Sequence, residues 1–169
     1  IKLNMKNAYG LGHYHVNMAA MKQLGAWFDY LRAEGVYDNT KIILVADHGQ
    51  HLYQIQELVK NGTDLCSFYP MLMVKDFNST EFTVSNEFMT NADVPTIAFD
   101  GLIENPVNPF TGKPINSDEK YAHDQFIILS GVWDVNKNNG NTFLPSKWAS
   151  VSDDFWDKNN WTFYKDEMV

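Results

Sequence analysis

The stretch KIILVADHGQHL, residues 41–52, decides which fold this chain is expected to have. Lys41 to Ala46 is a largely continuous run of β-branched and aliphatic residues, which is typical of a strand buried on both faces. The run stops at Asp47 and His48, two residue types that bind divalent cations, and Gly49 then allows a sharp turn. This pattern predicts a metal site at the rim of a sheet. The alternative is that Asp47 caps local structure and His48 is a partly buried, hydrogen-bonded imidazole.

The segment before this run has the spacing of a one-sided helix. Between Tyr14 and Glu34, apolar residues recur every three or four positions, at Val16, Ala20, Leu24, Trp27, Phe28 and Leu31. Gly35 is expected to end the helix, because glycine tolerates the left-handed backbone that follows many helices. Helix, turn and buried strand together predict an α/β fold with a mostly parallel central sheet and flanking helices.

Further elements are expected downstream. We expect strands at Tyr69 to Lys75, Gln125 to Ser130 and Trp161 to Tyr164, with an asparagine-rich polar stretch at Asp134 to Asn141. Asn91 to Pro95 resembles a capped helix start, and the prolines and glycine between Glu104 and Asp118 indicate a loop. Residues 1–169 are expected to form a single domain.

Composition limits the possible functions. The chain has 13 basic and 21 acidic residues and a net charge of −8, which argues against a nucleic-acid partner. The sequence contains no apolar run of the roughly 20 residues that a membrane-spanning helix requires. The single cysteine, Cys66, cannot form an internal disulfide, so it says nothing about the redox compartment.

The stretch from His13 to Gly49 resembles the alkaline phosphatase and sulfatase superfamily. In that superfamily an amphipathic helix leads through a turn like Gly35-Val36-Tyr37-Asp38-Asn39-Thr40 into a strand that ends in Ser-Asp-His-Gly, where this chain has Ala46 in place of the serine. Tyr69 to Lys75 is similar to the family's Pro-Leu-Leu-Val-Lys strand. Thr90 to Thr96 is similar to its Asp-Leu-x-Pro-Thr helix start, although one residue shorter. These matches cover about residues 13 to 100.

The resemblance implies that the chain is the carboxyl-terminal part of an alkaline phosphatase-like (sulfatase-like) catalytic domain. Asp47 and His48 then match the ligands of a divalent ion (Ca, Mn or Zn). The nucleophile and the first acidic ligands are expected in a missing amino-terminal half of the same polypeptide. Cys66 lacks the Cys-x-(Pro/Ala)-x-Arg pattern of a sulfatase nucleophile. The isolated chain is therefore expected to be inactive.

The expected activity is metal-dependent hydrolysis or transfer of sulfate or phosphate esters, with a glycan or a lipid headgroup as the candidate substrate. The lack of the soluble-sulfatase pattern of glycine, histidine and lysine after Gly49 favours a membrane-anchored parent at the extracellular or cell-envelope face. Imidazole binds a metal only when neutral, and its ordinary pKa is about 6.5, so occupancy should fall below about pH 6.

Other residues are weaker candidates for binding substrate. The four remaining histidines are candidates for contacts to substrate oxygens, each weighed against an ordinary surface histidine: His13, His15, His51 and His123. Lys60 is a candidate for binding sulfate. Three tryptophans are candidates for a sugar-stacking platform, although tryptophans more often fill a core: Trp148, Trp156 and Trp161.

A function of a different class is also open. In that alternative the chain is a non-catalytic module that binds a glycan or a protein, and Asp47-His48-Gly49 is only a structural turn. Whichever function holds, a strand that lacks neighbours from an absent half leaves open sheet edges, so self-association is expected.

Overall fold

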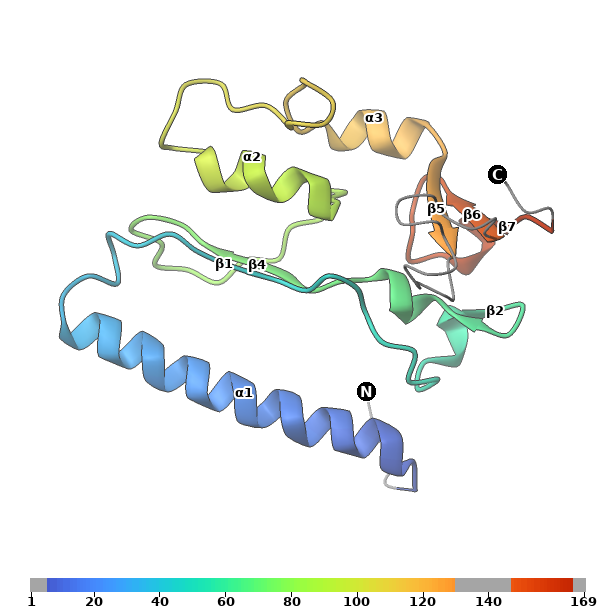
Figure 1. Ribbon diagram of the computed structural model, residues 1–169, viewed down its shortest axis with the longest axis horizontal. Coiled ribbons are helices and arrows are strands. Elements are labelled where there is room, and N and C mark those ends of the chain that lie inside the picture. The colour runs from blue at the N-terminus through green and yellow to red at the C-terminus, as the bar shows by residue number, and fades with distance from the viewer. Residues whose placement is uncertain (1–5, 130–146, 166–169) are drawn as a thin grey trace, which may run out of the picture.

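The computed structural model describes residues 6–129 and 147–165. Figure 1 shows a long helix, α1, on one side of a two-stranded ribbon, β1 and β4, with the shorter helices α2 and α3 on the other side. A three-stranded sheet, β5-β6-β7, lies at one end. None of the helices in these ranges is long and apolar enough to cross a membrane.

Helix α1 spans Ala8–Ala33, so it begins earlier than the apolar spacing predicts. The cause is Asn7, whose side chain accepts a hydrogen bond from the backbone N–H of Gly10 at 2.9 Å and caps the first turn. The predicted end is confirmed, because Gly35 follows the helix with a φ of +71°. The apolar spacing predicts that one face of α1 is buried, and this is largely wrong. Val16 is 70% exposed, and Gly10 is the only buried residue of α1.

The strand that leads to Asp47 is β1, Ile42–Val45, and its neighbour is β4, Leu72–Lys75. Both strands were predicted, but the prediction of a mostly parallel, alkaline phosphatase-like central sheet is wrong. The two strands pair antiparallel, with Ile42 opposite Lys75 and Val45 opposite Leu72. A continuous apolar run indicates a strand but not its direction. Here the intervening chain turns back, so β4 runs against β1.

A small hairpin lies in the connection between these strands. Strands β2, Val59–Lys60, and β3, Thr63–Asp64, pair antiparallel around Asn61 and Gly62, which both have positive φ angles. Asn-Gly is the preferred sequence for this tight turn. Two short 3₁₀ helices flank the hairpin, η1 at Gln56–Leu58 and η2 at Leu65–Phe68. The sequence analysis did not predict this hairpin, although the Asn61-Gly62 pair indicates a tight turn.

The predicted helix start at Asn91 to Pro95 is confirmed. A 3₁₀ turn, η3, Asn91–Asp93, continues directly into α2, Val94–Phe99. The proline-rich stretch from Glu104 is a loop as expected, and α3, Ser117–Ala122, begins near its end.

The third sheet is antiparallel throughout. It consists of β5, Gln125–Leu129, β6, Lys147–Val151, and β7, Trp161–Phe163, with β6 in the centre. A further 3₁₀ turn, η4, Lys158–Asn160, precedes β7. The strands predicted at Gln125 and Trp161 are confirmed, whereas Ser130 and the stretch from Asp134 to Asn141 lie outside the described residues.

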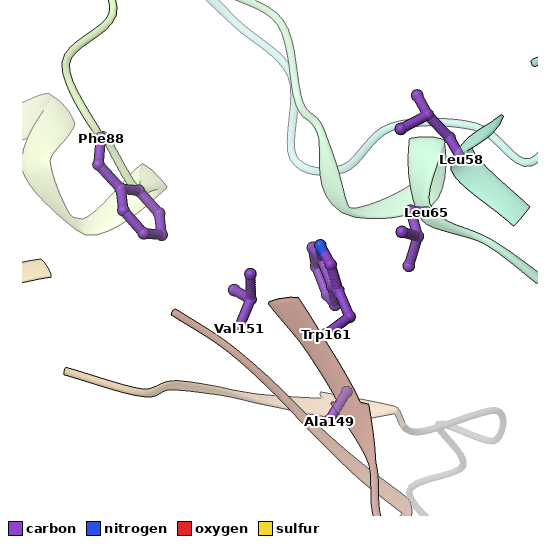
Figure 2. Packing of buried hydrophobic residues seen from close by; sticks show 6 residues of the cluster. All are labelled: Leu58, Leu65, Phe88, Ala149, Val151 and Trp161. Carbon is purple, nitrogen blue, oxygen red and sulfur yellow. The ribbon is translucent and has the colours of Figure 1, made fainter. Parts of the chain in front are cut away.

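The main core is not at β1 but where the hairpin region meets the third sheet (Figure 2). Trp161 lies at its centre, 2% exposed, with its ring stacked on Phe68 at a centroid distance of 5.2 Å. The Trp161 indole N–H donates a hydrogen bond to the carbonyl of Phe155 at 2.8 Å. The buried apolar cluster comprises Leu58, Leu65, Phe88, Ala149, Val151 and Trp161.

Candidate functional site

Asp47 and His48 follow β1 after the single residue Ala46, at the point where the ladder with β4 ends. The last backbone bond runs from the N–H of Ala46 to the carbonyl of Met71, at 2.9 Å. Beyond it the chain is no longer held as a strand, so the side chains of Asp47 and His48 are not forced onto opposite faces. This is the location that the sequence predicts for the pair, although the sheet beside it is antiparallel.

The two side chains converge rather than diverge. Asp47 Oδ2 lies 3.7 Å from His48 Nε2, and the side chains are 90% and 68% exposed, respectively. With metal–ligand bonds of about 2.1 Å, two donors on one tetrahedral ion are about 3.4 Å apart. The observed separation is close to this value.

Local hydrogen bonds hold the other atoms of the pair. Asp47 Oδ1 accepts a hydrogen bond from the His48 backbone N–H at 2.9 Å, which leaves Oδ2 available. His48 Nδ1 lies 2.6 Å from the carbonyl oxygen of Gly49. Because a carbonyl can only accept, Nδ1 carries the hydrogen in this contact, and in the neutral ring Nε2 presents its lone pair. Metal-binding histidines use this second hydrogen bond to fix the ring and its tautomer.

Gly49 is needed for a different reason than the sequence suggests. Its φ is not positive; instead, a Cβ at this position would overlap the carbonyl oxygen of Cys66 and approach that of Tyr69. The Gly49 backbone N–H also donates to the carbonyl of Ser67 at 2.9 Å. Close backbone approach to η2, rather than a left-handed conformation, therefore excludes a side chain here.

No third ligand joins the pair within the described residues. Across residues 6–129 and 147–165, no group of three or more His, Cys, Asp or Glu side chains is placed to hold an ion. The pair alone offers one carboxylate and one imidazole. A closed coordination sphere would need water, substrate oxygens or further protein ligands.

Asp47 and His48 line a broad, open groove. Other parts of its wall come from β4, from the segment around Phe88, and from aromatic residues that include Tyr69 and Trp156. The Trp156 ring packs on Tyr69 at a centroid distance of 4.4 Å and remains 55% exposed. The side chains of Asp47 and His48 are thus open to solvent.

The other four histidines do not join the pair in a ligand group. His13 packs against Tyr9, whose hydroxyl contacts Gln50, so the start of α1 lies near the segment after His48. His15 packs on Tyr14, His51 packs on Tyr53, and His123 is the C-cap of α3. None of them lines the groove. Their expected contacts with substrate remain predictions.

Lys60 and the three candidate tryptophans also do not come together in one site. The Lys60 ammonium donates to the backbone carbonyls of Trp161 and Asn159, so it is engaged in holding β7. Trp161 is core and Trp148 is partly buried, which leaves Trp156 as the exposed member of the predicted platform. The three tryptophans therefore do not form one stacking surface.

The surroundings of Cys66 disfavour its reactive thiolate form. Burial, the hydrogen bond with Asp64 and the charge of Asp64 raise the pKa of the Cys66 thiol to about 11. A thiol with this pKa is almost entirely protonated at neutral pH and is a poor nucleophile.

One contributor to the site was missed by the sequence reading. The side chain of Asn91, at the start of η3, contacts the backbone on both sides of Asp47. The sequence indicates a polar helix start at this position but not which strand end lies beside it.

Comparison with known proteins adds no relative. No protein-family model matches the sequence, and no curated protein or solved structure is significantly similar to it.

Proposed function

We propose that this chain supplies Asp47 and His48 as ligands of a divalent cation in a metal-dependent, sulfatase-like hydrolase or transferase of sulfate or phosphate esters. The observation that carries the proposal is the geometry of the pair. Asp47 Oδ2 and His48 Nε2 face one another at 3.7 Å, are exposed to a groove, and are backed by local hydrogen bonds. The resemblance of residues 13 to 100 to that superfamily suggests the reaction class.

The chemistry of the ligands explains what such a site would do. A bound cation stabilises the negative charge that develops on the transferred group and lowers the pKa of a coordinated oxygen. Asp47 would contribute a negative oxygen ligand, and His48 a neutral nitrogen ligand whose orientation the Gly49 carbonyl fixes. The open groove would admit the ester beside them.

The proposal gives the described residues no nucleophile. The raised pKa of Cys66, caused by burial and by Asp64, argues against the one thiol as the nucleophile. We place the nucleophile and the remaining metal ligands in a preceding part of the same polypeptide, with the parent enzyme at the cell envelope. The substrate would be an ester of a glycan or of a lipid headgroup.

A metal titration tests the proposal. Mn²⁺, Zn²⁺ and Ca²⁺ are titrated by calorimetry into the intact wild-type protein, its Asp47→Ala variant and an Asp29→Ala control. Asp29 is an exposed aspartate of α1 that pairs with Arg32. We expect at least one ion to bind the wild type and Asp29→Ala equally, and Asp47→Ala to lose that binding. Equal binding by all three proteins would refute the proposed site.

A second candidate function is a glycan-binding module, and exposed Trp156 packed on Tyr69 favours it. Aromatic rings of this kind stack on the apolar faces of sugars. In that case soluble oligosaccharides would quench tryptophan fluorescence in the absence of metal, and Trp156→Ala would abolish the quenching. Metal-independent quenching together with unchanged metal binding in Asp47→Ala would favour the module over the enzyme.

A further inference from the structure

Beyond the last hydrogen bond between β1 and β4, two backbone carbonyls accept hydrogen bonds from the same side chain. The side-chain nitrogen of Asn91 donates to the carbonyl of Ala46 at 3.0 Å and to that of Asp47 at 2.9 Å. A primary amide carries two N–H donors, so a single Asn91 side chain can serve both acceptors.

These two carbonyls belong to the peptide units on either side of the Asp47 Cα. Holding both units restrains the φ and ψ angles of Asp47 and therefore the direction in which its Cβ projects. The second of these units also carries the His48 N–H, which donates to Asp47 Oδ1 at 2.9 Å. Asn91 thus restrains the peptide unit that carries the His48 N–H. This N–H in turn orients the Asp47 carboxylate through its hydrogen bond.

Asn91 is itself firmly held, because Asp93 anchors η3. The Asp93 carboxylate is buried and accepts hydrogen bonds from the backbone N–H and the hydroxyl of Thr90, at 2.9 and 3.1 Å. It also pairs with the Lys120 ammonium of α3 and accepts from the Asn108 amide, both at 3.0 Å. These contacts hold the backbone at the start of η3, and from there the Asn91 side chain reaches the end of β1.

From this arrangement we infer that Asn91 is a positioning residue for the Asp47–His48 cation site. The inference rests on the proposed function. It goes further by assigning a role to a side chain that is not one of the two proposed metal ligands. Groups that orient metal ligands typically contribute about 10- to 100-fold to metal affinity.

The test measures Mn²⁺ binding by nuclear magnetic resonance on the intact protein labelled with ¹⁵N. Paramagnetic broadening of the backbone amide signals of Asp47, His48 and Gly49 gives the Mn²⁺ concentration at half effect. Two variants remove the donors, Asn91→Ala and the bulkier Asn91→Leu. The control, Asn160→Ala, removes an asparagine whose side-chain amide donates to the backbone carbonyl of Asp154 at 2.8 Å, away from Asn91. Asp47→Ala serves as the reference without a carboxylate.

We expect both Asn91 variants to raise the half-effect concentration about 10-fold or more, and Asn160→Ala to leave it within about twofold of the wild type. Thermal unfolding of each variant shows whether its stability loss matches that of Asn160→Ala, which separates positioning from general destabilisation. If the Asn91 variants bind like the wild type while Asp47→Ala does not, this inference is wrong and the cation site stands. An equal loss of binding in Asn160→Ala would also overturn it. If Asp47→Ala still binds, the proposed site fails and the inference fails with it.

Discussion

At the scale of single residues, Gly49 has the closest surroundings of the glycines in the described residues. The backbone of η2 approaches it so closely that even one methyl group would overlap the carbonyl oxygen of Cys66. A backbone atom cannot move aside as a flexible side chain can, so the strand end or η2 would have to shift.

We therefore predict that Gly49→Ala destabilises the protein by about 3 kcal/mol or more, because overpacking against the backbone is costly. The control is Gly25→Ala in the interior of α1, where an added Cβ meets no heavy atom within 4 Å. That change should stabilise the chain by about 0.5–1 kcal/mol through helix propensity. Urea unfolding curves of the two variants measure the difference. A mild effect of Gly49→Ala would show that η2 does not constrain this turn.

At the scale of elements, a buried ion pair joins η3 to α3. Burial by itself would raise the pKa of Asp93, but the hydrogen bonds from Thr90, Lys120 and Asn108 outweigh it and hold the pKa below its ordinary value. A carboxyl group whose pKa is lower in the folded state stabilises the fold above its unfolded pKa of about 4. That contribution is lost as the pH falls through the folded pKa.

We predict that the free energy of unfolding falls as the pH drops below about 4 and that Asp93→Asn removes this part of the acid sensitivity. At neutral pH, Asp93→Asn should cost about 3–5 kcal/mol, because it leaves the largely buried Lys120 ammonium without its partner. Asp118→Asn, an exposed change in the first turn of α3, is the control and should cost less than about 1 kcal/mol. Denaturant titrations at several pH values measure both effects. If Asp93→Asn and Asp118→Asn cost the same, the ion pair does not hold these elements together.

The elements also show where sequence patterns succeed. The helix before Gly35, the strands at Ile42 and Leu72, and the capped start at Asn91 were all predicted, because each depends on contacts within a few residues. The direction in which β4 pairs with β1 was predicted wrongly. It depends on the path of some 25 intervening residues, including the β2-β3 hairpin, and no local pattern encodes that path.

At the scale of the whole molecule, much apolar surface is uncovered. In the described part of the chain, β1 pairs only with β4, so both outer edges of this sheet are open. Val45, Met73 and Val74 are exposed there, and Val16, Trp27 and Tyr30 are exposed on α1. Open edges with apolar side chains are templates for pairing with another chain.

We predict that the chain self-associates as its concentration rises, forming dimers or larger species detectable by light scattering. Met73→Lys places a charge on the exposed face of β4 and should shift the onset to higher concentration. Phe110→Lys, in the exposed loop before α3, is the control for an added charge and should change the onset less. A monomer at all concentrations tested would contradict the prediction.

The sequence by itself determined the local features of this protein. These are the helix that ends before Gly35, the strand that stops at Asp47, and the two ligand-type side chains that follow it. Hydrophobic spacing and turn chemistry act over a few residues, so the primary structure shows them directly. Tertiary structure alone decided the antiparallel sheets, the core around Trp161 and the contact of Asn91 with the backbone at Asp47. These features bring together residues far apart in the chain, and what brings them together is the joint packing of all the elements rather than any single segment.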